Sequence, residues 1–257
     1  MLKRILVGVD KSEGARTALA WAATVGQSTG AEVIVASTVA DAEVASAGDP
    51  ALGGLRRVVL EGDPRFALAQ AGIDEDADLI VAGSSGISWY PAIHTDHVAH
   101  HLVCHADRAV AIVPQGSPPV PVSCAVLAID GSPGSRAAVD WLAAEEASMT
   151  SKVIVLYSLA AALPDRVQPA PMLPLATEED LHAWAQPLAQ RGIEVSTLYT
   201  SDEPVSAICA AAGPLEGSTV VIGGRPVDDR HPLRLGQVGL RLLSKATRPV
   251  IVVPPVA

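Results

Sequence analysis

Residues 125–142, "AVLAIDGSPGSRAAVDWL", repeat the pattern of residues 5–22, "ILVGVDKSEGARTALAWA". Each stretch starts with an apolar run that ends in an aspartate, Asp10 or Asp130. It then passes through a serine and a glycine into apolar residues at helical spacing. A short β-prone run followed directly by a helical pattern is typical of a βα unit in a parallel sheet. The chain therefore contains the same βα start twice.

Further similarities follow in the same order along the chain. They join 61–68, "EGDPRFAL", to 201–208, "SDEPVSAI"; 78–83, "DLIVAG", to 218–223, "STVVIG"; and 105–114, "HADRAVAIVP", to 245–254, "KATRPVIVVP". The register shifts by 20 residues between the first similarity and the later ones, so the second copy carries an extra segment in its middle. Ordered similarities of this kind indicate a duplication. We predict domains at 1–115 and 122–257, joined by the proline-rich "QGSPPVP" at 115–121.

The extra segment of the second copy predicts an additional helix. The stretch "TEEDLHAWAQPLAQRG" has an N-cap candidate in Thr177, acidic residues in its first turn and a stop signal in Gly192. Pro187 should kink this helix. The first copy has a short, glycine-containing stretch at 40–55 in the equivalent place, so we expect that copy to lack one covering helix.

Composition limits the classes of protein to which the chain can belong. Hydrophobic residues make up 49% of its 257 residues, mostly Ala, Val, Leu and Ile, which suits strands buried on both faces. A net charge of −10 argues against nucleic acid and anionic membranes as partners. No apolar run approaches the roughly 20 residues that cross a bilayer. The three widely spaced cysteines resemble reduced apolar residues rather than a disulfide framework, which predicts a cytoplasmic protein.

The quoted motifs resemble those of the universal stress protein family, twice over nearly the whole chain. The resemblance rests on "GVD" or "AID" before S and G-S/A-R-x-A, on "EGDP", on "DLIVAGSSG" and on the closing "VxxHAxxxVxIVP". It implies an α/β fold of two tandem Rossmann-like, adenine nucleotide alpha hydrolase-like domains. Each would be a parallel five-stranded sheet of order 3-2-1-4-5, flanked by helices, with ligands near the switch in strand order. Members often pair through their last strands, which implies an intramolecular pseudo-dimer of the two domains and allows a homodimer.

Many members of this family bind ATP through a Gly-x2-Gly-x9-Gly-Ser/Thr pattern, whose glycines let backbone amides approach phosphate. In the first copy Gly83 and Gly86 match the first two glycines, and Asp10 matches the aspartate that contacts the adenine side. Asp96 stands where Gly-Ser is expected and brings a negative charge to a phosphate position. Asp96 would instead suit the N-cap of the following helix. We therefore expect no family-type ATP binding in the first copy.

The second copy keeps a different subset of the pattern. Gly223 and Gly236 match the first and third glycines, while Pro226 replaces the second and Gln237 replaces Ser/Thr. Arginines nearby could hold a phosphate by paired hydrogen bonds, or could belong to a solvated loop that aspartates partly neutralise. The resemblance implies the following candidate contacts for ATP or another adenine nucleotide: Asp130, Gly223, Gly224, Arg225, Gly236 and Gln237.

Signatures of catalysis are absent from the sequence, so we predict a protein that is not an enzyme. There is no G-x-S-x-G elbow, no Walker lysine after either glycine loop and no C-x-x-C. Five of the seven histidines lie between 94 and 105, and His97, His101 and His105 share one helix face. Ordinary half-buried histidines explain this cluster, and metal binding is the alternative. We expect a stress-response regulatory module, and a scaffold that binds no nucleotide is the rival hypothesis.

Overall fold

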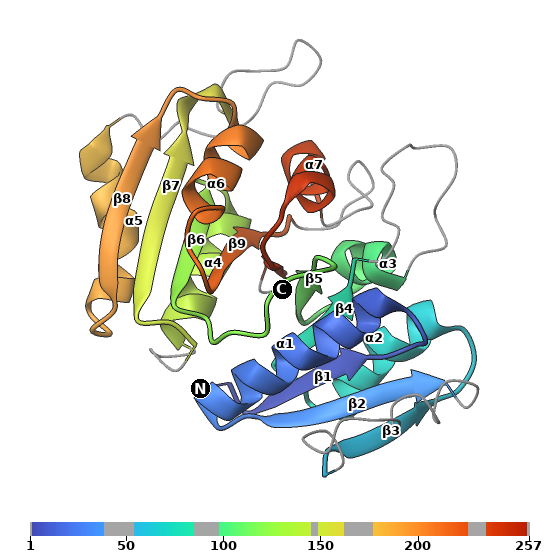
Figure 1. The fold of residues 1–257 in the computed structure, drawn as a ribbon. Helices are drawn as coiled ribbons and strands as arrows, with labels where there is room; N and C mark the ends of the chain where they lie inside the picture. The colour runs from blue at the N-terminus through green and yellow to red at the C-terminus, as the bar shows by residue number, and fades with distance from the viewer. Residues whose placement is uncertain are drawn as a thin grey trace. The chain divides into compact units, whose positions relative to one another are not determined.

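Two compact units make up the chain in this computed structural model (Figure 1). The N-terminal unit comprises Leu2–Pro121 with Pro249–Ile251, and the C-terminal unit comprises Val122–Arg248 and Val252–Ala257 with Met1. The structure describes the following residues: 2–38, 54–84, 98–144, 149–161, 177–225 and 235–255. None of the helices in these ranges combines the length and apolar character that crossing a bilayer requires.

The N-terminal unit is a parallel five-stranded sheet of order β3-β2-β1-β4-β5. Its strands are β1 (Arg4–Gly8), β2 (Glu32–Thr38), β3 (Arg56–Leu60), β4 (Leu79–Gly83) and β5 (Ala109–Val113). Its helices are α1 (Glu13–Thr29), α2 (Pro64–Asp74) and α3 (Val98–His105). The strand order 3-2-1-4-5 that the family resemblance implied is thus confirmed, and α1 leaves the sheet directly after β1, as the βα pattern predicted.

The C-terminal unit repeats this arrangement with the order β8-β7-β6-β9-β10. Its strands are β6 (Cys124–Ile129), β7 (Lys152–Ser158), β8 (Glu194–Thr200), β9 (Ser218–Gly223) and β10 (Val250–Val253). Its helices are α4 (Pro133–Ala144), α5 (Glu178–Ala189), α6 (Pro204–Ala212) and α7 (Gln237–Lys245), and a single 3₁₀ turn, Leu159–Ala161, follows β7. The α/β fold class is therefore confirmed in both copies.

Helix α5 is the additional helix that the extra segment predicted. Thr177 caps it, and a capping box forms because the Asp180 amide donates to the Thr177 hydroxyl while the Asp180 carboxylate accepts from the Thr177 amide. Pro187 lies inside the helix, and Gly192 follows it at φ 79°. The expectation that the first copy lacks the equivalent helix falls on residues 39–53, which lie outside the described residues.

The interior strands β4 and β9 are buried at every residue except their last glycine, as parallel strands covered by helices must be. Every residue of β5 is buried, and so is every residue of β10. Two of the cysteines, Cys104 and Cys124, lie in the core as small apolar residues, and Cys209 is half-buried.

A backbone contact between glycines holds the first helix of each unit against the fourth strand. A Cβ atom on Gly83 would lie 2.4 Å from the Gly14 carbonyl carbon, and one on Gly223 would lie 2.0 Å from that of Gly134. No side chain fits between the backbones at such separations. The helix can therefore lie flat on the strand end only because glycine stands on both sides. This packing explains why residues 83 and 223 are glycines without any role in ligand binding.

We predict that Gly223→Ala destabilises the protein by about 1–3 kcal/mol or more, because its Cβ would overlap the backbone of Gly134 rather than a movable side chain. Denaturant unfolding measures the change in the free energy of unfolding. Gly236→Ala is the matched control, since nothing lies within 4 Å of a Cβ at that position. Equal losses in the two variants would show that the glycine contact is not what limits packing.

Candidate functional site

The candidate site of the C-terminal unit lies at the carboxyl ends of β6 and β9, where the strand order switches direction. β6 leads through Asp130 into α4, and β9 leads through Gly223 toward α7. In open parallel sheets this switch is where ligands bind, because the loops diverge and helix N-termini point toward the space between them. The close contact of Gly134 with Gly223 and Gly224 brings the first loop against the end of the fourth strand.

Asp130 is held in place by a network of serines. The Ser135 hydroxyl donates to the Asp130 carboxylate at 2.7 Å and accepts from the Asp130 amide at 2.9 Å. The Ser132 amide donates to the same carboxylate oxygen at 3.0 Å, and the Ser132 hydroxyl accepts from the Ser135 amide at 3.1 Å. Ser135 is 3% exposed, whereas Asp130 is exposed. A buried hydroxyl thus fixes an aspartate that faces solvent and remains able to accept further hydrogen bonds.

The equivalent loop of the N-terminal unit lacks part of this network. The Asp10 carboxylate accepts from the Ser12 amide at 2.8 Å, and Ser12 caps α1 through the Ala15 amide. Ala15 stands where the C-terminal unit has Ser135, so no hydroxyl reaches Asp10 from that position. Sequence reasoning treated Asp10 and Asp130 as equivalent and missed this serine. The alanine-to-serine difference inside the repeated motif was the signal that could have revealed it.

The residues after β9 are engaged in the sheet. The Gly224 amide donates to the Val253 carbonyl at 2.7 Å, and Gly224 is buried. In the N-terminal unit the Ser84 amide likewise donates to the Val113 carbonyl at 3.0 Å. The amide at this position is therefore already bonded within each unit and cannot also serve a phosphate. Arg225 is half-buried. The next described residues are Leu235 and Gly236, directly before α7.

The first turn of α7 lies at the end of β9. Gly236 is the N-cap of this helix, and no side chain caps it. A Cβ on Gly239 would contact Leu235 at 2.0 Å and Ile222 of β9 at 3.3 Å, so the helix start rests on the strand just before Gly223. Gln237 is the first helical residue. The structure thus brings Gly236 and Gln237 to the strand end that carries Gly223 and Gly224.

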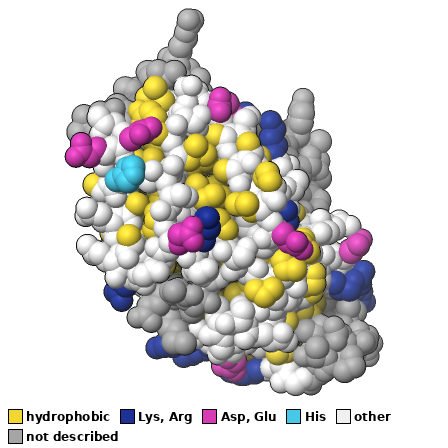
Figure 2. Space-filling model, turned by 60° about the vertical axis from the view of Figure 1, so that its left-hand side comes forward, with side chains coloured by type: hydrophobic (Ala, Val, Ile, Leu, Met, Phe, Trp, Pro, Cys, Tyr) yellow, Lys and Arg dark blue, Asp and Glu magenta, His cyan; other side chains and the backbone are white. Residues whose placement is uncertain are grey.

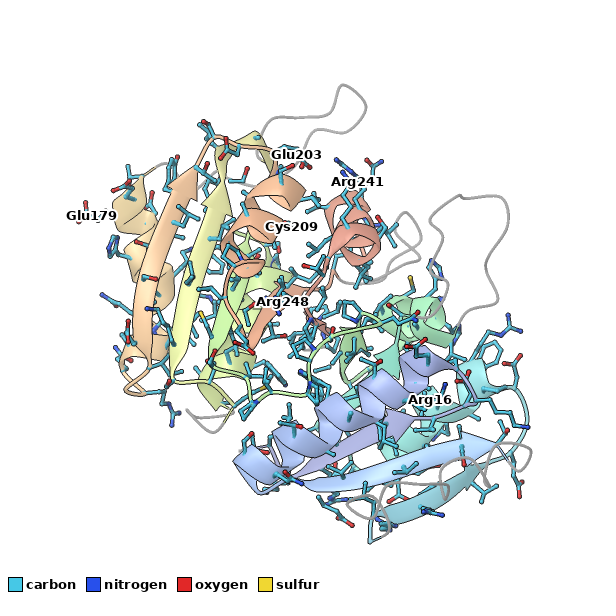
Figure 3. All side chains as sticks on the ribbon, in the orientation of Figure 1. Arg16, Glu179, Glu203, Cys209, Arg241 and Arg248 are labelled. Carbon is cyan, nitrogen blue, oxygen red and sulfur yellow. The ribbon has the colours of Figure 1, made fainter. Side chains whose placement is uncertain are left out.

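A charged pair joins the start of α6 to the middle of α7 (Figure 3). The Arg241 guanidinium lies 3.1 Å from the carboxylate of Glu203, the N-cap of α6. Burial acts to raise the pKa of Glu203, but hydrogen bonds from the Ser206 amide and hydroxyl, together with the Arg241 charge, hold it below its ordinary value. Both partners are partly exposed, so the pair contributes little stability.

The rest of the predicted phosphate loops lies outside the described residues. This applies to Gly86 and Asp96 of the first copy and to Pro226 of the second. The statements about their charge and backbone therefore stay predictions.

The histidines of α3 pack side by side on the surface of the N-terminal unit. The His101 and His105 ring centroids are 4.6 Å apart, and the Phe66 ring meets His101 edge-on at 4.6 Å. Burial, followed by the charge of His105, lowers the pKa of His101. Within the part of the chain that the structure describes, no group of three or more potential metal ligands converges. His94 and His97 lie outside that part.

Comparisons with known proteins agree with this duplicated fold. The sequence profile described as the universal stress protein family matches residues 1–56 and 125–254. The matched residues include Asp130, Gly223 and Gly236. No curated protein matches the sequence.

Solved structures share the fold over nearly the whole chain. A universal stress protein from Archaeoglobus fulgidus DSM 4304 superposes with a TM-score of 0.70 at 19% identity, over 98% of this chain and 96% of that one. A putative universal stress protein from Pseudomonas aeruginosa UCBPP-PA14 gives a TM-score of 0.63 at 14% identity, over 99% and 94% of the two chains. A functionally unknown protein from Pseudomonas aeruginosa PAO1 gives 0.62 at 16%, over 99% and 93%.

A duplicated parallel α/β sheet with an aspartate-bearing loop at each switch point defines a tandem Rossmann-like protein. The profile match covers more than half of the chain, and the chain belongs to the universal stress protein family.

We predict that the stability of the protein rises between pH 5 and pH 7 in a manner that depends on His101. Its pKa is lowered in the folded state, so the unfolded chain binds the proton first as the pH falls below about 6.5, and folding stability is lost there. His101→Gln should flatten this slope, as measured by urea unfolding at several pH values. Measurements at pH 8, where the imidazole is neutral in both states, provide the reference. An unchanged slope in the variant would contradict the assignment.

Proposed function

We propose that this chain is a regulatory module of the stress response, without enzymatic activity, whose C-terminal unit binds an adenine nucleotide such as ATP. The observation that carries the proposal is the first turn of α7. It begins at Gly236 without a side-chain cap and rests on the end of β9. Uncapped N-terminal amides carry a partial positive charge and favour phosphate.

The position of Asp130 supports the same proposal. This aspartate directly follows β6, the neighbour of β9, and is exposed while the buried Ser135 holds it. A carboxylate fixed in this way can accept hydrogen bonds from ribose hydroxyls or from an adenine amino group without losing side-chain entropy on binding. The nucleotide would therefore place its base side near Asp130 and its phosphates toward α7.

The glycines after β9 would not donate hydrogen bonds to phosphate as the family pattern implies. The Gly224 amide is bonded to Val253, and Gly223 is needed for packing against Gly134. These glycines would shape the floor of the site rather than donate to phosphate. The amides of the α7 first turn, with Arg225 near the strand end, would supply the donors.

We do not extend the proposal to the N-terminal unit. Asp10 lacks the hydroxyl partner that Ser135 gives to Asp130, and Lys11 stands in place of Gly131, which has φ 83°. The family profile matches this unit only as far as residue 56, before Gly83 and Gly86. These differences support a unit that keeps the fold and has lost the ligand.

A scaffold without any nucleotide is the second candidate. The sheet engagement of Gly224 favours it, because a glycine loop that has lost a free amide is what a decayed site would show. A direct measurement of nucleotide binding distinguishes these two candidate functions.

We predict that ATP binds the protein and that Gly236→Asp weakens this binding at least tenfold while the fold stays intact. Aspartate is a favoured N-cap residue and should stabilise α7 relative to glycine by about a few tenths of a kcal/mol, and the position has open space for it. Its charge would repel a phosphate at the helix start. Titration calorimetry measures the affinity, and thermal melting checks that stability is not lost.

Asp130→Ala should also weaken ATP binding, whereas Asp10→Ala in the matched loop of the N-terminal unit should leave it unchanged. Equal effects of the two aspartate variants would argue against a site in the C-terminal unit. If the unaltered protein gives no heat with ATP, ADP, AMP or cyclic AMP, the nucleotide proposal is wrong and the scaffold remains.

A further inference from the structure

Aromatic side chains join helices α2 and α3 of the N-terminal unit. The Phe66 ring of α2 meets the His101 ring of α3 edge-on, and the His105 ring lies beside His101, with 4.6 Å between the ring centroids in each contact. Phe66 is the only phenylalanine in the chain and is 60% exposed, whereas His101 is half-buried. Because an imidazole ionises near neutral pH, this contact contains a group whose charge changes under mild conditions.

The equivalent helix pair of the C-terminal unit, α6 and α7, is joined by fixed charges instead. In the register of the repeat, Arg241 stands in the place of His101. Glu203 likewise stands in the place of Asp63, and its carboxylate lies 3.1 Å from the Arg241 guanidinium. Arginine keeps its charge throughout the pH range in which proteins fold. The two copies of the fold thus join the same two helices with a titrating ring in one unit and with an ion pair in the other.

The groups around His101 disfavour a proton on its ring. His100 and His105 lie near it on α3, and Arg65 and Asp63 lie near it at the start of α2. β4 and β5, which also pack against α3, carry no titratable side chain. Asp63 is the only carboxylate in this group, and its charge is already paired with Arg65 at 2.6 Å. Burial, followed by the charges of His105 and Arg65, lowers the pKa of His101.

We propose that protonation of His101 releases α3 from α2, so that mild acid loosens the N-terminal unit at this contact and leaves the C-terminal unit closed. Proton binding and release of the helix are linked, because the closed contact holds the proton more weakly than an open one does. The contact is therefore closed above about pH 6.5, the ordinary pKa of histidine, and opens progressively as the pH falls below it. This response needs no nucleotide, and it gives the N-terminal unit, to which we assign no ligand, a role of its own.

The ion pair of the C-terminal unit persists over the same range of pH. Burial acts to raise the pKa of Glu203, but hydrogen bonds from Ser206 and the charge of Arg241 hold it below its ordinary value. Both partners therefore remain charged between about pH 5 and pH 8. Helix α7 thus serves as an internal reference for α3 in the same molecule.

Hydrogen exchange of the full chain, followed by mass spectrometry, compares the two helices directly. The protection of an amide is its intrinsic exchange rate divided by the measured rate, which removes the effect of pH on the exchange chemistry. Between about pH 7.5 and pH 5.5, the protection of α3 should fall about three- to tenfold, since linkage to a single histidine permits at most about tenfold one unit below its ordinary pKa. The protection of α7 should stay constant. Equal changes in the two helices, or constant protection of α3, would overturn the proposal.

Three substitutions test the assignment to one ring. In His101→Gln the protection of α3 should lose its dependence on pH, because glutamine is polar and carries no charge. His105→Gln should shift the opening to higher pH, since the charge of His105 lowers the pKa of His101. Asp63→Asn should shift the opening to lower pH, since the charge of Asp63 acts in the opposite sense and asparagine still caps α2. An α3 that still opens in His101→Gln, or shifts of the reverse sign, would contradict the proposal.

A histidine of the C-terminal unit provides the matched control. His182 is exposed on α5, and its Nδ1 atom lies 2.7 Å from the Glu178 carbonyl oxygen. Figure 2 turns the side of α5 and β8 toward the viewer and shows a histidine at that surface beside acidic side chains. In His182→Gln the protection of α3 should keep its full dependence on pH. Loss of that dependence in this variant would show that the response does not arise at His101.

A fluorine label reports on the contact between the rings themselves. Because Phe66 is the only phenylalanine, 3-fluorophenylalanine gives the full chain a single ¹⁹F signal. This signal should titrate with the same midpoint as the exchange of α3, and it should not titrate in His101→Gln. Far-UV circular dichroism should stay unchanged over the same range, which distinguishes release of one helix from unfolding of the protein. A fluorine signal that is independent of pH, or one that changes only when the circular dichroism is lost, would overturn the proposal.

Discussion

The contact of two glycine backbones, Gly14 with Gly83 and Gly134 with Gly223, is the constraint on which both sheets depend. It sets the first helix of each unit directly on the end of the fourth strand, so that the loop after the first strand meets the loop after the fourth. The candidate site of the C-terminal unit exists because of this approach. A side chain at either glycine would lift the helix and separate Asp130 from the end of β9.

The two copies share this constraint and differ in what surrounds it. In the C-terminal unit Ser135 holds Asp130, and α7 starts at an uncapped glycine. In the N-terminal unit Ala15 leaves Asp10 with a simpler set of partners. The buried position in the first helical turn accepts either alanine or serine because both side chains are small and the Ser135 hydroxyl is hydrogen-bonded to Asp130.

The family resemblance implied the strand order, and the sequence itself predicted the additional helix α5 and the capping role of Thr177, because hydrophobic periodicity and capping chemistry are local properties. The sequence could not distinguish a glycine that binds phosphate from a glycine that lets a helix pack against the end of a strand. Gly83 and Gly223 suit a phosphate loop equally well in sequence, and only the position of Gly14 and Gly134 reveals the packing role. The hydrogen bond from the Gly224 amide to the Val253 carbonyl could not be predicted either, because Val253 is distant in the chain.

The arginines of β3 have a consequence for assembly as a whole. If the third strand of both units offered a neutral edge, molecules could add to one another without end and form fibres. Arg56, which is paired with Glu75 at 2.7 Å, and Arg57 set two exposed guanidinium groups at the start of the β3 edge and so work against this growth.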